Sequence, residues 1–452
     1  MNLEKFLYKK LSLWILLLTI ILSFIMTILF GSLVLRSTTA KNIALIPVHL
    51  GKIFSKVEND FVVGDNKFGK QDKFVKFSTK PEDLSGYLLL SRYDYKKKRS
   101  IVEILIIKNG KILHTWAPDI NKINNFSKLP KQHLNLKRDH NLARYRILHP
   151  ILLENGDLII KSMISPIVRI SACSKMKWFV DKAFHHSIEF DFDGNIWVPG
   201  VNFPPTIKGI NIDLSRRDGR IFTEDTIESL SQEGKILFSK PLLQIFIDNK
   251  IEHLLPTGWR LAHSESNLDL LHLNDVQPVF YDSKYWKKND VFVSLSALSL
   301  VLLYRPSTNK VIWYKRGPWV LQHDVDVIND HQIAIFNNNL DSFLKVDGYN
   351  ETLIYDFDKD EIFSPYRAGY KKNNIRTIRE GLSEILENGD IFVEDTSNGR
   401  ILRMDKMGNV KWQFTNIEEN GKIYLVNWSR FLNESSYSKI IEKISNIKCN
   451  EK

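Results

Sequence analysis

The sequence is poor in cysteine. It has two among 452 residues, Cys173 and Cys449, and no Cys-x-x-Cys pair. This scarcity excludes a small disulfide-framed scaffold and argues against a thioredoxin-like redox motif or a zinc ribbon. The two cysteines could pair in an oxidising compartment, and the sequence leaves that open. A G-x-x-x-x-G-K-[ST] motif is also missing, so no P-loop nucleotide site is predicted.

Nucleic-acid signatures are missing as well. Lysine and arginine total 63 against 52 aspartate and glutamate residues, and the net charge is +11. The excess is spread along the chain, without a dense arginine block, a zinc-finger spacing or an aromatic RNA-binding motif. We therefore expect no nucleic-acid partner. Hydrophobic residues at 43% and charged residues at 25% are ordinary globular usage, which excludes a disordered or collagen-like chain.

Charge is absent from residues 11–35, which read LSLWILLLTIILSFIMTILFGSLVL. About 20 apolar residues cross a bilayer as a helix, whereas a cleavable signal peptide has an apolar region of only ~7–15 residues. Residues 1–40 are therefore predicted to be a cytoplasmic stub and a single transmembrane signal-anchor. Lys5, Lys9 and Lys10 precede the span, which weakly favours the body outside the inner membrane, on the periplasmic side. A cleaved signal peptide is the alternative.

The body repeats one pattern, two apolar strands around a turn with Gly or Asn-Asp. Asn-Gly and Asp-Gly between apolar runs are strong hairpin signals. Four strands per unit at a period of roughly 40–60 residues is typical of propeller blades, so we predict an all-β propeller with six blades, or alternatively seven. The expected divisions are a stalk or linker at 41–85, the propeller at 86–425 and a tail at 426–452. The hairpins lie at 106–116, 151–160, 188–198, 229–240, 288–293, 325–336 and 382–396, with outer ones at 301–317 and 401–414.

Histidines recur at matching places in this repeat. His149, His186 and His323 each lie seven or eight residues before a turn, and His272 precedes a hairpin with a longer insert. Equivalent positions on different blades gather around one axis. Imidazole can be a base, acid, nucleophile or metal ligand. No carboxylate lies at the same distance from the turn in these repeats, so we predict no metal site. A ring of imidazoles that donate hydrogen bonds instead suits an oxyanion. The alternative is that these histidines only fill a shared blade geometry.

Several longer segments carry a resemblance. Residues 268–339 contain LHLNDVQPV, DVFVSLSALSLVLLYRPSTNKVIW, GPWVLQHDVDVI and IAIFNNN, and FHHSIEFDFDGNIWV lies at 184–198. Residues 381–414 read GLSEILENGDIFVEDTSNGRILRMDKMGNVKWQF. With these pieces the chain resembles the arylsulfotransferase family over about residues 86–414. The resemblance implies a six-bladed propeller.

The resemblance also implies an activity. Family enzymes move a sulfuryl group from an aryl sulfate to a phenol, without a cofactor, by a ping-pong route through a sulfated histidine. By position in the motifs, His323 is the covalent acceptor. His272 and Asn274 hold the sulfuryl oxygens or handle the phenol proton, and His186 completes the anion cradle. The other expected substrate-binding residues are His185, His149 and Arg379.

One departure concerns the family's Arg in its Ser-Leu-Arg-Asn stretch. Ser296 takes that place here, and this removes a guanidinium that would clamp a tetrahedral anion. Arg379 or Arg376 could replace it. The departure keeps open a second function, a non-catalytic propeller that binds an anionic ligand or a protein partner. A metal-dependent propeller enzyme built on the four repeated histidines is a third.

Overall fold

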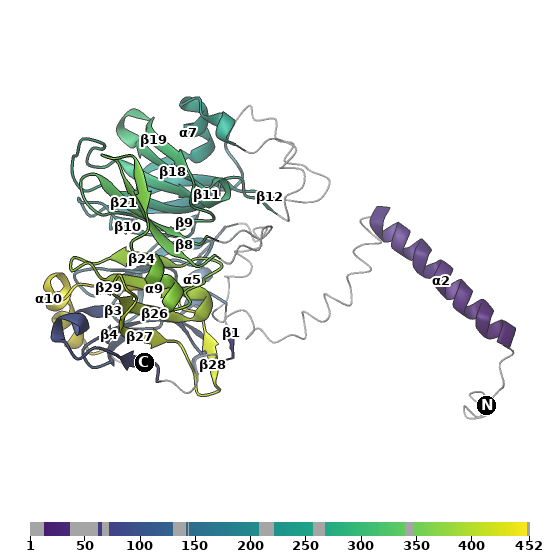
Figure 1. Cartoon of the computed structure of the whole chain (residues 1–452), viewed down its shortest axis with the longest axis horizontal. Coiled ribbons are helices and arrows are strands. Elements are labelled where there is room, and N and C mark those ends of the chain that lie inside the picture. The colour runs from purple at the N-terminus through teal and green to yellow at the C-terminus, as the bar shows by residue number, and fades with distance from the viewer. Residues whose placement is uncertain are drawn as a thin grey trace. The chain divides into compact units, whose positions relative to one another are not determined.

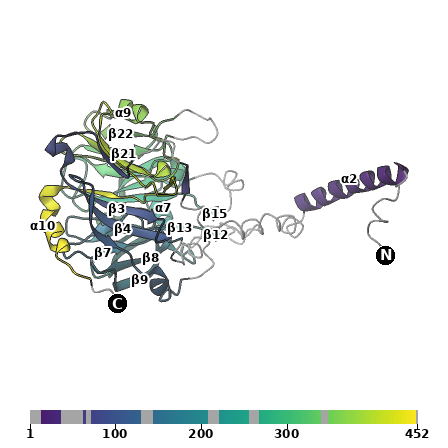
Figure 2. The same cartoon turned by 90° about the horizontal axis from the view of Figure 1, so that it is seen from below.

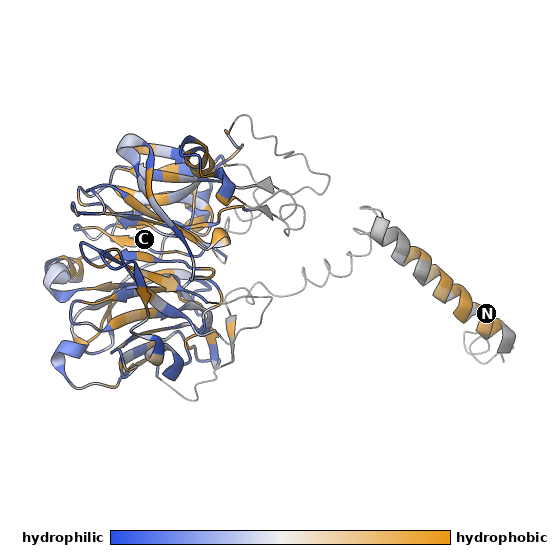
Figure 3. Cartoon of the chain, turned by 45° about the horizontal axis from the view of Figure 1, so that its top comes forward, coloured by the Kyte–Doolittle hydropathy of each residue, from blue (hydrophilic) through white to orange (hydrophobic). Residues whose placement is uncertain are grey.

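The computed structural model describes residues 13–36, 62–65, 72–129, 142, 144–207, 221–255, 267–339 and 348–449. The chain divides into two units, Met1–Asp60 and Phe61–Lys452. In the first unit, the uncharged run forms helix α2 (Leu13–Arg36), which is largely orange in Figure 3. Within the described residues, no helix was found that is long and apolar enough to cross a bilayer. The transmembrane anchor stays a prediction, and the expected stub and most of the expected stalk lie outside the described residues.

The second unit is built from antiparallel sheets (Figures 1 and 2). One sheet joins β29 (Arg430–Leu432), β3 (Tyr87–Asp94), β4 (Arg99–Ile106) and β5 (Lys111–Trp116). Another joins β16 (Leu273–Pro278), β17 (Val291–Leu295), β18 (Leu300–Arg305) and β19 (Lys310–Arg316). A third joins β20 (Val325–Val327), β21 (Gln332–Asn337), β22 (Glu351–Asp356) and β23 (Glu361–Phe363). A five-stranded sheet joins β2 (Phe74–Lys76), β27 (Val410–Thr415), β26 (Arg400–Met404), β25 (Ile391–Asp395) and β24 (Leu382–Ile385).

The largest sheet has eight strands. Its path is β14 (Ile236–Pro241), β13 (Glu224–Leu230), β11 (Ile196–Asn202), β9 (Met176–Phe184), β8 (Ser165–Ile170), β7 (Leu158–Ile160) and β6 (Ile151–Leu152), and β10 (Glu189–Phe190) pairs with β11. Strands β9 and β11 share only two paired positions, and these join two four-stranded runs. The predicted all-β, propeller-like fold is confirmed. The sheets give four separate blade-sized units and this joined one, so six blades, or seven, stays a prediction.

Most of the predicted hairpins form as the sequence pattern indicates. Strand pairs β4–β5, β6–β7, β10–β11, β13–β14, β20–β21 and β24–β25 are antiparallel neighbours, as are β18–β19 and β26–β27. The turns need a left-handed backbone, which glycine adopts without a Cβ penalty. Five turn glycines have φ between 70° and 83°: Gly110, Gly156, Gly194, Gly234 and Gly389. The turn at Asn289 instead closes a longer connection between β16 and β17.

The propeller-like unit extends beyond the expected 86–425 at both ends. Strand β2 pairs with β27, and β29 pairs with β3, so segments near the two ends of the unit complete sheets begun elsewhere. Helix α10 (Glu434–Ser445) follows and buries Ile441 and Ile444. A Cys173–Cys449 disulfide then ties the end of the chain to the turn between β8 and β9. This pairing settles the question that the sequence leaves open.

Smaller elements complete the unit. The other helices are α5 (Ile120–Asn124), α7 (Leu242–Asp248) and α9 (Arg367–Lys372), with 3₁₀ turns η2 (Pro81–Leu84), η3 (Glu252–Leu254), η4 (Ser296–Leu298), η5 (Pro306–Thr308) and η6 (Thr396–Asn398). Two short pairs are β1 (Val62–Asp65) with β28 (Lys422–Tyr424), antiparallel, and β12 (Ile221–Phe222) with β15 (Asn267–Leu268), parallel.

The core lies between neighbouring sheets. Trp313 on β19 stacks on Tyr355 of β22 with ring centroids 5.1 Å apart. Trp412 on β27 is fully buried in a cluster that includes Leu88 and Leu90 of β3. Both tryptophans therefore pack between sheets. Aromatic pairs of this kind contribute about 0.5–1.5 kcal/mol beyond the area that they bury.

A left-handed residue precedes the first strand of each repeat in the described chain. Such residues lie before β6, β10, β16, β20, β24 and β29, with φ between 50° and 58°: His149, His186, His272, Leu321, Glu380 and Trp428. None is a glycine, and this conformation costs roughly 1–2 kcal/mol per residue. The rings of His186 and His272 lie 5.2 Å apart, and those of His149 and Trp428 also 5.2 Å apart. The repeat therefore brings side chains from distant parts of the sequence into contact.

Candidate functional site

Three of the predicted histidines converge. The ring of His186 lies 5.2 Å from that of His272 and 6.2 Å from that of His323. Two of them, His186 and His272, line a cavity of about 100 Å³, and His323 does not. The cavity is lined by His185, His186, Asp225, Asp269, His272 and a group of mainly apolar residues, Met163, Ile164, Val201, Thr223 and Leu273.

Hydrogen bonds define the tautomer of His323. The Asn338 amide nitrogen donates to the backbone oxygens of Thr377 (3.2 Å) and Glu380 (2.8 Å). Its oxygen therefore faces His323 and accepts from Nδ1–H at 2.8 Å. Nε2 then carries the lone pair and accepts from the Glu380 amide at 3.1 Å. Burial and the charge on His272 lower the pKa of His323 to about 4, so its imidazole is neutral near pH 7.

His272 is biased toward the protonated form. Its Nδ1 lies 2.6 Å from Oδ2 of Asp269, three residues earlier. Loss of solvent lowers the pKa of His272, but the Asp269 carboxylate raises it more, and the net shift is upward. The site therefore favours the protonated form of His272 and the neutral form of His323, an arrangement that separates a cationic donor from a nucleophile.

His185 and His186 form a direct pair. Their Nδ1 atoms lie 2.7 Å apart, so one ring donates and the other accepts. Burial lowers the pKa of His185 to about 3 and that of His186 well below its ordinary value. Both rings are therefore neutral. The side-chain nitrogen of Lys161, a fully buried residue whose pKa burial lowers well below its ordinary value, donates to the His186 backbone oxygen and holds that left-handed residue in place.

Asn274 supports the site from behind. Its side chain is fully buried, and its amide nitrogen donates to the backbone oxygen of Gln322 at 2.9 Å. Gln322 immediately precedes His323. This contact fixes the backbone immediately before His323, so the structure gives Asn274 a positioning role.

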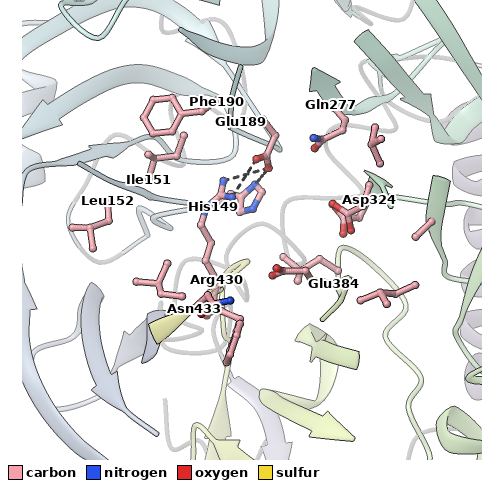
Figure 4. Close-up of a pocket in the computed structure, with 18 of the residues that line it drawn as sticks. His149, Ile151, Leu152, Glu189, Phe190, Gln277, Asp324, Glu384, Arg430 and Asn433 are labelled. Atoms are coloured by element: carbon pink, nitrogen blue, oxygen red, sulfur yellow. Dashed lines mark hydrogen bonds and ion pairs between the residues drawn. The ribbon is translucent and has the colours of Figure 1, made fainter. Parts of the chain in front are cut away.

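His149 lies apart from the other histidines. The ring centroid of Trp428 lies 5.2 Å from that of His149 and 6.3 Å from that of His186. His149 lines a different cavity, of about 460 Å³. Figure 4 shows His149 and Arg430 both reaching Glu189, with Asp324 and Glu384 across the cavity. The structure thus does not bring His149 to the site of His323.

The convergent histidines lie within the segment that identifies the family. The family model described as arylsulfotransferase (ASST) matches residues 149–417, more than half of the chain. The chain belongs to the arylsulfotransferase family. This membership supports a sulfotransferase and small-molecule aryl substrates.

Solved structures offer more distant likenesses. A protein of unknown function from Bacteroides caccae is 10% identical with a TM-score of 0.44, covering 77% of this chain and 99% of its own. Virginiamycin B lyase from Staphylococcus aureus is 10% identical with a TM-score of 0.33, and the match covers 59% of this chain and 69% of the lyase. A streptogramin B lyase is 11% identical with a TM-score of 0.39, and the match covers 78% of this chain and 97% of that lyase. No curated protein matches the chain.

The place of the arylsulfotransferase arginine is occupied by a small buried residue. Ser296 lies in η4, and its backbone amide and hydroxyl both donate to the His272 backbone oxygen, at 3.1 and 3.3 Å. Arg379 is exposed, and its charge acts on His272, where it lowers the pKa. Within the part of the chain that the structure describes, no hydrogen bond or ion pair engages its guanidinium. Arg376 instead stacks on Tyr349, 4.0 Å from the ring centroid.

Sequence reasoning missed several partners of the arylsulfotransferase site. Asp269 was detectable, because an aspartate three residues before a histidine is a local pairing signal. Asn338 lies in the resembling segment IAIFNNN, but nothing in the segment indicates its bond to His323. Arg146 pairs with Glu380 at 2.8 and 2.5 Å, across 234 residues. No spacing rule indicates such a pair.

Among the residues with described positions, no group of three or more His, Cys, Asp or Glu side chains could hold a metal ion. The carboxylates at the site are each engaged otherwise, since Asp269 contacts His272 and Asp225 accepts from the Leu273 amide at 3.1 Å.

Proposed function

We propose that this protein is a membrane-anchored arylsulfotransferase that transfers a sulfuryl group from an aryl sulfate to a phenol through a sulfated His323. The observation that carries the proposal is the pairing of charge states at one place. A neutral His323 with a fixed Nε2 lone pair lies close to His186, which in turn contacts an imidazolium, His272. A nucleophile needs a neutral imidazole with a free lone pair, and a sulfate anion is bound by a protonated imidazole.

In the first half-reaction, Nε2 of His323 leaves the Glu380 amide and attacks the sulfur atom. The N–S bond forms as the S–O bond to the aryl group breaks, and the aryl oxygen keeps the electron pair. The sulfuryl oxygens lie against the His272 imidazolium, which remains charged because of Asp269. In the second half-reaction, a phenol oxygen attacks the same sulfur and the electron pair of the N–S bond returns to Nε2. Asn338 keeps Nδ1 protonated throughout.

Arg379 is the side chain that best replaces the missing family arginine. It lies beside Glu380, whose amide contacts the nucleophile, and its charge reaches His272. A charge-assisted hydrogen bond from this guanidinium would bind the anionic substrate. His149 lies outside this site, so we expect no contact between His149 and the substrate.

The periplasmic location is supported by two features of the chain. Residues 11–35 carry no charge over a length sufficient for a bilayer. The Cys173–Cys449 disulfide fits an oxidising compartment such as the periplasm. Membrane fractionation of the full-length protein, with protease access from the periplasmic side, tests this part. Release of the protein by high salt without detergent would contradict the anchor.

The second candidate function is a non-catalytic propeller that binds an anionic ligand. The specific observation in its favour is Ser296, because the buried hydroxyl donates to a backbone oxygen and offers no charge to an anion. In this case His272 and Arg379 would bind the anion, and His323 would remain unmodified.

Intact-mass analysis separates the two functions. The purified full-length protein is incubated with p-nitrophenyl sulfate, and we expect a gain of one sulfuryl group together with release of p-nitrophenol. The adduct should be missing in His323→Ala and present in the control His331→Ala, a partly exposed histidine paired with Asp330. A folded wild-type protein that gives neither adduct nor phenol would reject the sulfotransferase and leave the binding propeller.

A further inference from the structure

A buried chain of three side chains leads away from His186. Asp225 on β13 is 3% exposed, and its Oδ1 lies 3.6 Å from Nε2 of His185. Nδ1 of His185 lies 2.7 Å from Nδ1 of His186. Nε2 of His186 is therefore the one ring nitrogen of the pair left for the site. Catalytic hydrogen bonds are often long in unliganded proteins and tighten when substrate binds, so 3.6 Å is compatible with transfer.

We propose that Asp225, His185 and His186 form a proton relay that exchanges the phenol proton with the buried Asp225 carboxyl group. This inference rests on the proposed sulfuryl transfer, since the relay serves its two half-reactions. It gives a role to Asp225 and to both histidines of the pair, while His272 remains the cation that binds the sulfuryl oxygens.

The relay has two forms that differ by one proton. In the loaded form, the Asp225 carboxyl donates to Nε2 of His185, Nδ1–H of His185 donates to His186, and Nε2–H of His186 faces the site. In the unloaded form, Nε2–H of His185 lies between Asp225 and the Gly200 backbone oxygen, 3.4 Å away. His186 then carries its proton on Nδ1 and presents a lone pair at Nε2. Each ring stays neutral in both forms.

The two forms match the two half-reactions. When the S–O bond breaks, the departing aryl oxygen takes the proton from Nε2 of His186. The Nδ1 proton of His185 then moves to His186, and the Asp225 proton moves to His185. When the acceptor phenol attacks the sulfated His323, its proton enters at Nε2 of His186 and travels back to Asp225. The proton count is restored at the end of each cycle.

The surroundings of Asp225 allow both of its charge states. Burial and the Asp269 carboxylate raise the pKa of Asp225 well above its ordinary value, which favours the loaded form. The Leu273 amide donates to Oδ2 at 3.1 Å, and the charge on His272 opposes the rise in pKa. Both contacts stabilise the carboxylate that forms when the relay gives up its proton.

Asp225→Asn breaks the relay with little change of shape. The amide oxygen of asparagine can accept from Leu273, and its nitrogen can donate to Nε2 of His185. That contact holds His186 permanently as the Nε2–H tautomer, with no proton supply behind it. His185→Gln breaks the relay one step later, and His114→Gln, a histidine bonded to the Ala172 oxygen away from the site, is the matched control.

The kinetic test compares acceptors of different acidity, with p-nitrophenyl sulfate as the donor at pH 8. With phenol, which has a pKa of about 10 and must lose a proton, both relay variants should turn over about 100-fold more slowly than wild type. With a nitrophenol that is already ionised, the loss should be below about fivefold. The His323 adduct should still form in both variants. Equal losses with both acceptors, or no loss, would overturn the relay.

A second readout does not depend on turnover. Nitrogen NMR of full-length protein labelled with ¹⁵N-histidine reports the tautomer of each ring. We expect His186 to change from Nε2–H to Nδ1–H in wild type as Asp225 ionises at high pH, and to stay Nε2–H in Asp225→Asn. An identical His186 tautomer in both proteins at every pH would overturn the relay. A wild type with switching tautomers but no sulfated His323 would reject the sulfotransferase alone.

Discussion

Removal of the Cys173–Cys449 disulfide should lower the free energy of unfolding of the propeller-like unit by about 2–4 kcal/mol. The bridge closes a loop of 276 residues, and loop-closure entropy alone sets a ceiling of about 5–6 kcal/mol for that length. The measured loss should be smaller than the ceiling, because other contacts hold the same end of the chain. Strand β29 pairs with β3, and α10 buries Ile441 and Ile444.

Urea unfolding followed by tryptophan fluorescence measures this loss. The proteins are the wild type, the double variant Cys173→Ser and Cys449→Ser, and the wild type with a reducing agent. The double variant and the reduced wild type should agree, and the reducing agent should leave the double variant unchanged. Equal stability of the oxidised and reduced wild type would refute the reasoning, since it would mean that the docking of β29 and α10 already fixes the chain end.

Three further predictions concern charge. Asp269→Asn removes the carboxylate that raises the pKa of His272, so sulfuryl transfer should fall more at pH 7.5 than at pH 5.5, as pH–rate profiles of wild type and variant would show. Burial raises the pKa of Glu394 to about 7, so its stabilising contribution is complete below about pH 4.5 and is lost as the pH rises through 7. Glu394→Gln should therefore cost up to about 3 kcal/mol more at pH 5 than at pH 8 in urea unfolding. Arg379→Gln should raise the KM for p-nitrophenyl sulfate at least about tenfold, whereas Arg376→Gln should change it little.

Each of these has an opposing outcome. A uniform loss of activity across pH in Asp269→Asn would show that Asp269 only supports the fold. The same cost of Glu394→Gln at both pH values would mean that Glu394 is ionised throughout. Equal KM values for the two arginine variants would remove Arg379 from the site and strengthen the case that no arginine replaces the family residue.

The strands and their hairpins were predictable because turn chemistry is local. Gly156, Gly194 and Gly389 each mark a turn that forms as expected, and the periodic spacing implies blades before any contact is known. The blade count was harder, since β9 and β11 share two paired positions and join two units into one sheet. The ends of the unit were also hard, because β2 and β29 are only three residues long and gain their order from partners more than 300 residues away.

The candidate site was predictable only in part. The repeat and the family motifs indicated His186, His272 and His323, whose convergence the structure displays. His149 has the same place in its repeat, yet it lines a different cavity and contacts Glu189. Spacing identifies the position of a residue within its own unit, whereas the side chain that a neighbouring unit supplies decides what that residue can touch. Asp225 and Asn338 were missed for the same reason.

The left-handed residue before each first strand has a consequence for how this architecture diversifies. The backbone at these places is set by the repeat, while the side chains are histidine at 149, 186 and 272, leucine at 321, glutamate at 380 and tryptophan at 428. One substitution in one unit therefore exchanges the side chain at such a place without moving a strand. β-branched replacements are disfavoured there by the positive φ, and Asn, Asp or Gly are tolerated. A new activity could arise on this scaffold by a few point mutations, with selection acting on a small, geometrically fixed set of sites.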